Sequence, residues 1–118
     1  QWEFRFLDGV FRFLARNWDG AAQAFAWCTE ATPEEPTAYH NLGCSLCKDG
    51  LPEAGCASAR VALSRFGGYS DARLLVSTGG RQVRLTRFPL RASLWRRDAT
   101  MSRSGDDASE RADSSSGC

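Results

Sequence analysis

Three residues near the middle of the chain have the types and the spacing that could do chemistry: His40, Cys44 and Cys47. They stand four and three residues apart, so on a helix they share one face and their side chains could converge on a zinc ion. Cys56 could supply a fourth ligand, but it falls on the next expected helix and should point elsewhere. Free cysteine also packs as a small hydrophobe. We therefore favour structural packing for these residues, and a small metal or redox module stays open as an alternative.

Other catalytic arrangements are not evident. The chain has a single histidine, and it carries no nucleophile elbow, no paired acids in an apolar pocket and no phosphate loop. We predict that the protein is not an enzyme, holds no cofactor and acts on no small-molecule substrate. Its five cysteines are an odd number, and without a sign of secretion they indicate reduced thiols in the cytoplasm or the nucleus.

The composition divides the chain of 118 residues into two parts. Apolar residues crowd into the first part, and Arg, Ser, Asp and Gly dominate after it. We predict a folded domain over residues 1–78 and a disordered tail over residues 79–118, Arg-rich at first and then rich in Ser and Asp. No hydrophobic run approaches the roughly 18 residues that a membrane span needs. The chain opens on Gln1, which we interpret as the start of a piece of something longer.

The spacing of apolar residues within the folded part predicts helices alone. Proline in the first turn and glycine after the last turn mark helix ends, as Pro36, Gly50 and Pro52 do here. Asp19 has the side chain of a helix cap and is expected to begin the second helix. The expected helices cover about residues 2–16, 20–32, 36–49, 52–66 and 71–76.

A pattern of small, apolar and helix-breaking residues is written twice at an interval of thirty-four residues. That interval is the period of the tetratricopeptide repeat, a helical hairpin that buries its apolar face by stacking on a neighbour. The run from Tyr39 to Gly43 resembles the aromatic-x-x-Leu-Gly opening of the family's first helix. The matching pairs are Gly9 and Gly43, Ala21 and Gly55, Phe25 and Ala59, Cys28 and Ala62, and Pro33 and Gly67.

The resemblance covers residues 2–76, about two repeats and a fragment. It implies antiparallel helical hairpins stacked as a solenoid fragment that serves as a protein-binding scaffold or adaptor. Gly9 and Gly43 should let the first helix of each hairpin approach Ala21 and Gly55 on the second. A third repeat fails at the glycine pair after residue 78, and such stacks usually need about three repeats. We therefore expect self-association or a need for neighbouring repeats.

The resemblance also implies a groove, because one stripe of each hairpin's first helix lines the concave face in the family. An apolar strip beside a polar one suits an extended peptide or a helix of a partner protein. Phe6, Val10 and Phe13 could instead meet a neighbouring repeat, and this alternative stays open. The expected groove residues are Phe6, Val10, Phe13, Thr37, His40, Cys44, Cys47 and Lys48.

One use of such grooves is not expected here. Family members that hold chaperone tails use a clamp of basic and Asn side chains, and only Asn41 matches it. Because Asn is common at that place for helix packing, we interpret Asn41 as a packing residue.

Residues 81–97 contain six arginines and no acid, with apolar residues between them. Basic and apolar residues mixed in this way can bind nucleic acid or an anionic membrane surface. However, Pro89 interrupts any single helix, and charged runs are often only solvated. We do not expect this activity, and it stays open as the alternative to protein binding.

Overall fold

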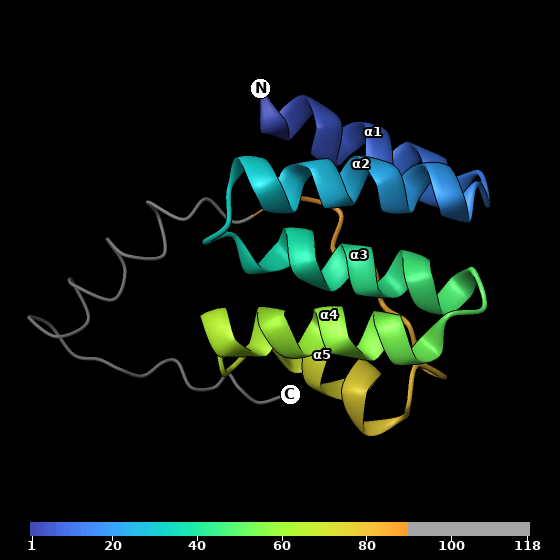
Figure 1. Cartoon of the computed structure of the whole chain (residues 1–118), viewed down its shortest axis with the longest axis vertical. Helices are drawn as coiled ribbons and strands as arrows, with labels where there is room; N and C mark the ends of the chain where they lie inside the picture. Colours follow the sequence, from blue (N-terminus) through green and yellow to red (C-terminus); the bar gives the residue numbers. More distant parts are fainter. Residues whose placement is uncertain (90–118) are drawn as a thin grey trace, which may run out of the picture.

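The computed structural model describes residues 1–89, and every regular element in that range is a helix. Consecutive helices are joined by short connections and pack against each other as a stack, in which α1 with α2 and α3 with α4 form hairpins (Figure 1). The predicted all-α stack of helical hairpins is confirmed. None of the described helices has the length and apolar character to cross a membrane. The helices are α1 (Trp2–Leu14), α2 (Trp18–Ala31), α3 (Pro36–Lys48), α4 (Pro52–Arg65) and α5 (Ser70–Ser77).

Local signals set the helix ends. Pro36 and Pro52 stand in the first turn of α3 and α4, where a missing N–H leaves no hydrogen bond unmade. The α2 cap differs from the prediction, because the Asn17 side chain, not that of Asp19, accepts the Gly20 N–H at 3.0 Å.

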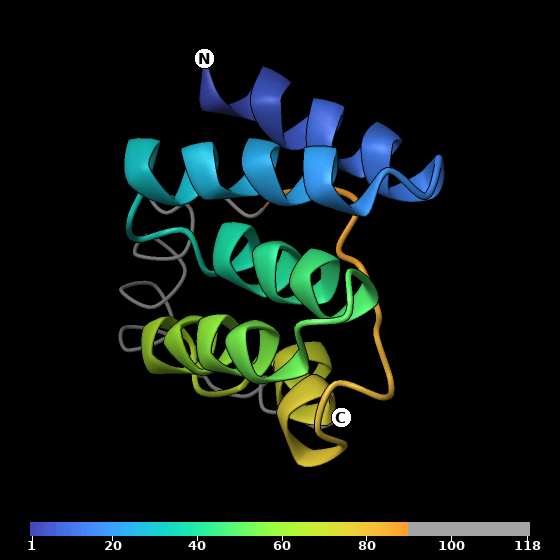
Figure 2. The ribbon, with the colours of Figure 1, turned by 45° about the vertical axis from the view of Figure 1, so that its right-hand side comes forward.

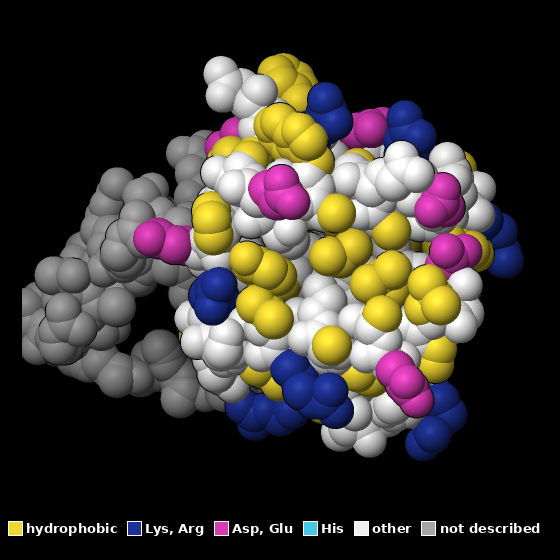
Figure 3. Space-filling view, viewed as in Figure 1, with side chains coloured by type: hydrophobic (Ala, Val, Ile, Leu, Met, Phe, Trp, Pro, Cys, Tyr) yellow, Lys and Arg dark blue, Asp and Glu magenta, His cyan; other side chains and the backbone are white. Residues whose placement is uncertain are grey.

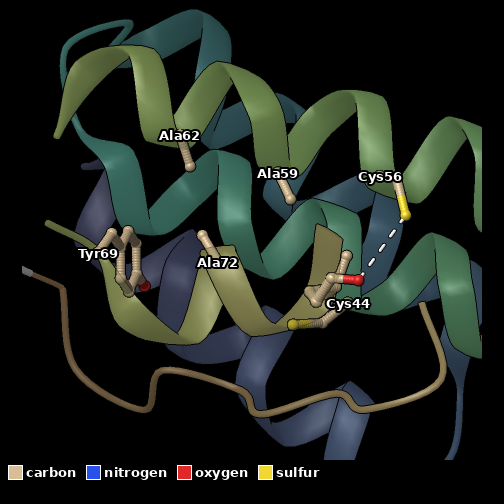
Figure 4. Close-up of a cluster of buried hydrophobic side chains, with 7 residues drawn as sticks. Cys44, Cys56, Ala59, Ala62, Tyr69 and Ala72 are labelled. Atoms are coloured by element: carbon tan, nitrogen blue, oxygen red, sulfur yellow. Dashed lines mark hydrogen bonds between the residues drawn. The ribbon is translucent and has the colours of Figure 1, made fainter. Parts of the chain in front are cut away.

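The core has two parts. In the N-terminal core, which joins α1, α2 and α3, the rings of Phe6 and Phe25 meet edge to face with centroids 5.4 Å apart. The C-terminal core joins α3, α4 and α5 and consists mainly of small side chains (Figure 4). The N-terminal core comprises Phe6, Val10, Ala21, Phe25, Cys28 and Ala38, and the C-terminal core comprises Cys44, Cys56, Ala59, Ala62, Tyr69, Ala72 and Leu75.

Glycines control how closely the helices approach. A Cβ atom added at Gly43 would lie 2.6 Å from the carbonyl oxygen of Gly55, so the backbones of α3 and α4 are nearly in contact. The predicted role of this pair is confirmed. At Gly9 the nearest neighbour of an added Cβ would be the ring of Phe25 on α2, at 2.7 Å.

The chain reverses after α5 and returns across the stack. Gly79 and Gly80 have φ angles of +63° and +85°, a conformation that glycine adopts without strain. Residues 81–89, here called the returning segment, follow as a stretched, non-helical trace that passes behind α3 in Figure 1 and beside it in Figure 2.

The returning segment changes the predicted domain boundary. Val83 and Leu85 are half-buried and pack against the helical core, so part of the range assigned to a tail belongs to the fold. The predicted start of the tail is therefore corrected for residues 79–89. The remainder of the predicted tail, residues 90–118, lies outside the described residues.

Candidate functional site

The returning segment lies against α3 and the beginning of α5. Val83 packs against the C-terminal core, and Leu85 packs against both cores. The Arg84 side chain between them is exposed. From Val83 to Leu85 the side chains therefore alternate between the helices and solvent, as they do along an extended strand. Figure 4 shows the segment running past the C-terminal core.

Asn41 of α3 holds both backbone groups of one residue in the segment. Its Nδ2 donates a hydrogen bond to the carbonyl oxygen of Thr86 at 2.7 Å, and its Oδ1 accepts the Thr86 N–H at 3.0 Å. An N–H and a C=O of the same residue point to the same side only when that residue is extended, as in a β-ladder. Asn41 is completely buried. The amide therefore pairs with extended backbone in the way that a neighbouring strand would.

His40 holds the backbone two residues earlier. Its Nε2 lies 2.5 Å from the carbonyl oxygen of Arg84, and because that oxygen only accepts, Nε2 carries the proton. Cys44 lies one turn along α3 and its S–H donates to the same oxygen over 3.6 Å. Arg84 and Thr86 thus present their backbone groups to one edge of α3.

The His40 ring is kept neutral by its surroundings. It is completely buried, and Nδ1 has no hydrogen-bond partner among the described residues. Burial lowers the pKa of His40 below its ordinary value of 6.5, although the Arg84 carbonyl and the charge of Asp71 act in the opposite direction. Protonation would place a second N–H donor in a buried site without an acceptor.

Tyr69 completes the site from the start of α5. Its ring is tilted against that of His40, with centroids 4.8 Å apart, and its hydroxyl is hydrogen-bonded to the Thr86 hydroxyl. Burial raises the pKa of Tyr69, so the phenol stays protonated. Beside this site, the Arg84 guanidinium lies 4.0 Å from the Asp71 carboxylate, and because both side chains are open to solvent the ion pair contributes little.

Two of the predicted groove residues, His40 and Cys44, contact the returning segment. Phe6 and Val10 do not line an open surface, because they are 0% and 5% exposed within the N-terminal core. Thr37 is also completely buried, and its hydroxyl donates to the Glu35 carboxylate at 2.8 Å. These three residues are corrected to interior positions.

The other three predicted groove residues lie away from the hydrogen bonds of the site. Phe13 is half-buried and meets the ring of Trp18 edge to face at 4.9 Å. Lys48 is exposed, and its Nζ lies 5.8 Å from the same indole ring. Cys47 is half-buried near α4, where its Sγ lies 4.0 Å from the Pro52 carbonyl oxygen.

Sequence reasoning missed Asn41, Tyr69 and Thr86 as residues of the site. A signal existed for Asn41, the one position that matched a family clamp residue, but it was interpreted as packing. Nothing in the sequence pairs it with Thr86, which is 45 residues away. Tyr69 precedes a short helix and shows no pattern of its own.

The described thiols do not form a metal-binding cluster with His40. Among residues 1–89, no three side chains of His, Cys, Asp or Glu lie together as a metal ion would require. His40 Nε2 already donates to the Arg84 carbonyl, and Cys47 points toward α4. Burial raises the pKa of Cys44, and it raises that of Cys47 to about 11. Both groups are therefore protonated thiols near neutral pH in the structure as it stands.

The arginines of the returning segment face solvent at Arg81, Arg84 and Arg87. Val83 and Leu85 turn toward the helices, whereas the Phe88 side chain next to Arg87 is 74% exposed. The rest of the predicted basic stretch lies outside the described residues. On the face seen in Figure 3, Lys and Arg side chains gather mainly along the edge formed by α4 and α5, and apolar side chains are spread over α2, α3 and α4.

No protein-family model, curated protein or solved structure matches this chain. The resemblance to tetratricopeptide repeats therefore stays a prediction from the sequence pattern. The functional argument rests on the geometry of Asn41, His40 and Tyr69 alone.

Proposed function

We propose that the protein is a non-catalytic protein-interaction module, a scaffold or adaptor, that binds an extended segment of a partner protein beside α3. The observation that carries the proposal is the paired hydrogen bonding of the Asn41 side chain with the backbone N–H and C=O of Thr86. Backbone pairing provides affinity for an extended chain, and contacts of alternate side chains provide selectivity. The returning segment is an example of a chain held in this way.

The same geometry favours an extended partner over a helical one. In a helix the backbone N–H and C=O groups are bonded within the helix, apart from those at its ends. Asn41 would then find neither a donor nor an acceptor on the partner backbone, and burying its amide without hydrogen bonds would be unfavourable. We therefore assign the site to an extended peptide.

The proposal also covers where the protein acts. Cys28, Cys44, Cys47 and Cys56 are free thiols, and free thiols persist in reducing compartments. We place the interaction in the cytoplasm or the nucleus.

A library of random peptides displayed on phage, panned against the Thr86→Pro chain, tests this proposal, because that substitution removes the N–H that Asn41 accepts and so frees the Asn41 side chain. We expect enriched peptides whose affinity for that chain falls by about 5- to 150-fold when Asn41→Ala is added to it, since two hydrogen bonds of about 0.5–1.5 kcal/mol each are lost. Gln23→Ala is the matched control, because it removes an exposed amide that donates a hydrogen bond to Asp19 on the same helix, α2. Failure to enrich peptides, or equal binding by the Asn41→Ala variant, would contradict the proposal.

A further inference from the structure

The site that we assign to a partner is already filled by the chain itself. His40, Asn41 and Cys44 are all completely buried, and the groups that they direct outward from α3 are bonded to Arg84 and Thr86. A second extended chain cannot reach Asn41 while the returning segment is in place. A partner must therefore displace that segment.

We propose that the returning segment is a built-in ligand of the α3 site, and that the partner peptide shares its pattern of apolar residue, any residue, apolar residue and hydroxyl residue, as in Val83 to Thr86. This inference rests on the proposed function and adds the chemistry of the partner to it.

Burial of Val83 and Leu85 explains why the pattern requires an apolar residue at these two positions. Leu85 packs against both cores and Val83 against the C-terminal core, so each removes apolar surface from water. A charged side chain at the place of Leu85 would have to be desolvated there. The place of Arg84 is unrestricted, since that side chain is exposed.

The contact with Tyr69 explains why the pattern requires a hydroxyl residue at the position of Thr86. This side chain is 8% exposed, and its hydroxyl is bonded to that of Thr86. A peptide with Val or Ala at this place would leave a buried phenol without that partner, which is unfavourable. Serine or threonine satisfies it.

The way the segment is attached makes its release feasible. The helices α1 to α5 contact one another directly, without the segment between them. The segment is joined to α5 through Gly79 and Gly80, whose backbone angles few other residues adopt. A short tether of this kind gives an effective concentration in the millimolar range. A free peptide that binds the opened site with a Kd of about 10 μM would therefore bind the native chain roughly a hundredfold more weakly.

The test uses a fluorescein-labelled peptide of residues 81–89 and the full-length chain, with binding followed by fluorescence anisotropy. The opening variant is Thr86→Pro, which removes the N–H that Asn41 accepts and the hydroxyl that Tyr69 contacts. Thr86→Val keeps the N–H and isolates the contribution of the hydroxyl. Leu85→Asp is a second opening variant, and circular dichroism reports whether each chain keeps its helices.

We expect the peptide to bind the Thr86→Pro chain at least tenfold more tightly than the native chain, with Thr86→Val between them. A peptide carrying Asp at the place of Leu85, or Val at the place of Thr86, should bind the opened chain at least tenfold more weakly than the parent peptide. Equal binding to native and opened chains would overturn the proposal, because the segment would then not occupy the peptide's site. Equal binding of parent and altered peptides would overturn the pattern.

Two further outcomes also decide the matter. If both opening variants lose their helices, the segment is an indispensable part of the core and not a ligand, and the inference fails. If neither opened chain binds the peptide while displayed peptides still bind through Asn41, the inference fails and the proposed function stands. Loss of both kinds of binding would end both proposals.

Discussion

Replacing Asn41 by alanine should release the returning segment and leave the helices folded. The substitution removes two hydrogen bonds to Thr86, of 2.7 and 3.0 Å. Each contributes about 0.5–1.5 kcal/mol net, so the docked state should lose about 1–3 kcal/mol relative to the released state. That difference corresponds to an increase of about 5- to 150-fold in the released fraction.

Limited digestion with trypsin measures that fraction. The Arg84 side chain is exposed, but its carbonyl is bonded to His40, so cleavage after Arg84 requires release. When opening and closing are fast, the cleavage rate follows the released population. We expect cleavage after Arg84 to accelerate by about 5- to 150-fold in the Asn41→Ala variant, and to stay unchanged in Gln23→Ala.

Cleavage after Arg60, on the exposed side of α4, distinguishes release of the returning segment from unfolding of the whole protein. The two sites should respond differently. An unchanged rate after Arg84 would refute the holding role of Asn41, and equal acceleration at both arginines would show that the variant unfolds as a whole.

Three further predictions concern the same fold. Gly43→Ala should destabilise the protein, because the added Cβ would lie 2.6 Å from the Gly55 carbonyl oxygen. The cost of overpacking, about 1–3 kcal/mol, exceeds the gain of about 1 kcal/mol in helix propensity. Urea unfolding measures the change in the free energy of unfolding, and the control Gly67→Ala, whose added Cβ has its nearest atom at 4.0 Å, should change it little. Docking of the returning segment should weaken as the pH falls below about 6.5, because burial lowers the pKa of His40 in the docked state and release restores it, so the released state binds more protons. NMR resonances of the segment, followed from pH 8 to pH 5, should move toward those of the released segment. Unchanged resonances would contradict the burial argument. Iodoacetamide should alkylate Cys44 faster in the Asn41→Ala variant than in the native chain, since the returning segment contacts the Cys44 Sγ. Mass spectrometry should find no such increase at Cys28, which is buried in the N-terminal core and whose pKa is raised to about 12.

The helices could be predicted from the sequence because their signals are local. Apolar spacing of three and four residues, prolines in first turns and glycines after last turns act within a few residues of each helix. The close approach at Gly43 and Gly55 also followed from the repeated pattern. The cap of α2 was misplaced, because Asn17 and Asp19 are both capping types and only the backbone geometry selects between them.

The returning segment could not be predicted in the same way. Its burial depends on residues more than 40 positions away, and a stretch of four residues with two apolar side chains among arginines has no clear period. Composition therefore assigned it to the tail, and its contacts with His40 and Asn41 could not be foreseen.

Two residues of the candidate site stood among the predicted groove residues. Helical spacing brought His40 and Cys44 together on one face of α3, and the structure has both against the segment. In α1 apolar residues occupy nearly the whole circumference, so the pattern could not tell which of them turn inward. Phe6 is in the core, whereas Phe4 and Phe11 are 76% and 69% exposed.

Amide hydrogen exchange at Thr86 in the native full-length chain, followed by NMR, tests the central claim most directly. The claim is that the α3 site holds an extended backbone through Asn41. We predict that the Thr86 amide exchanges at least about tenfold more slowly than in a free peptide of residues 81–89, because exchange requires local release. Exchange at the rate of the free peptide would contradict the claim.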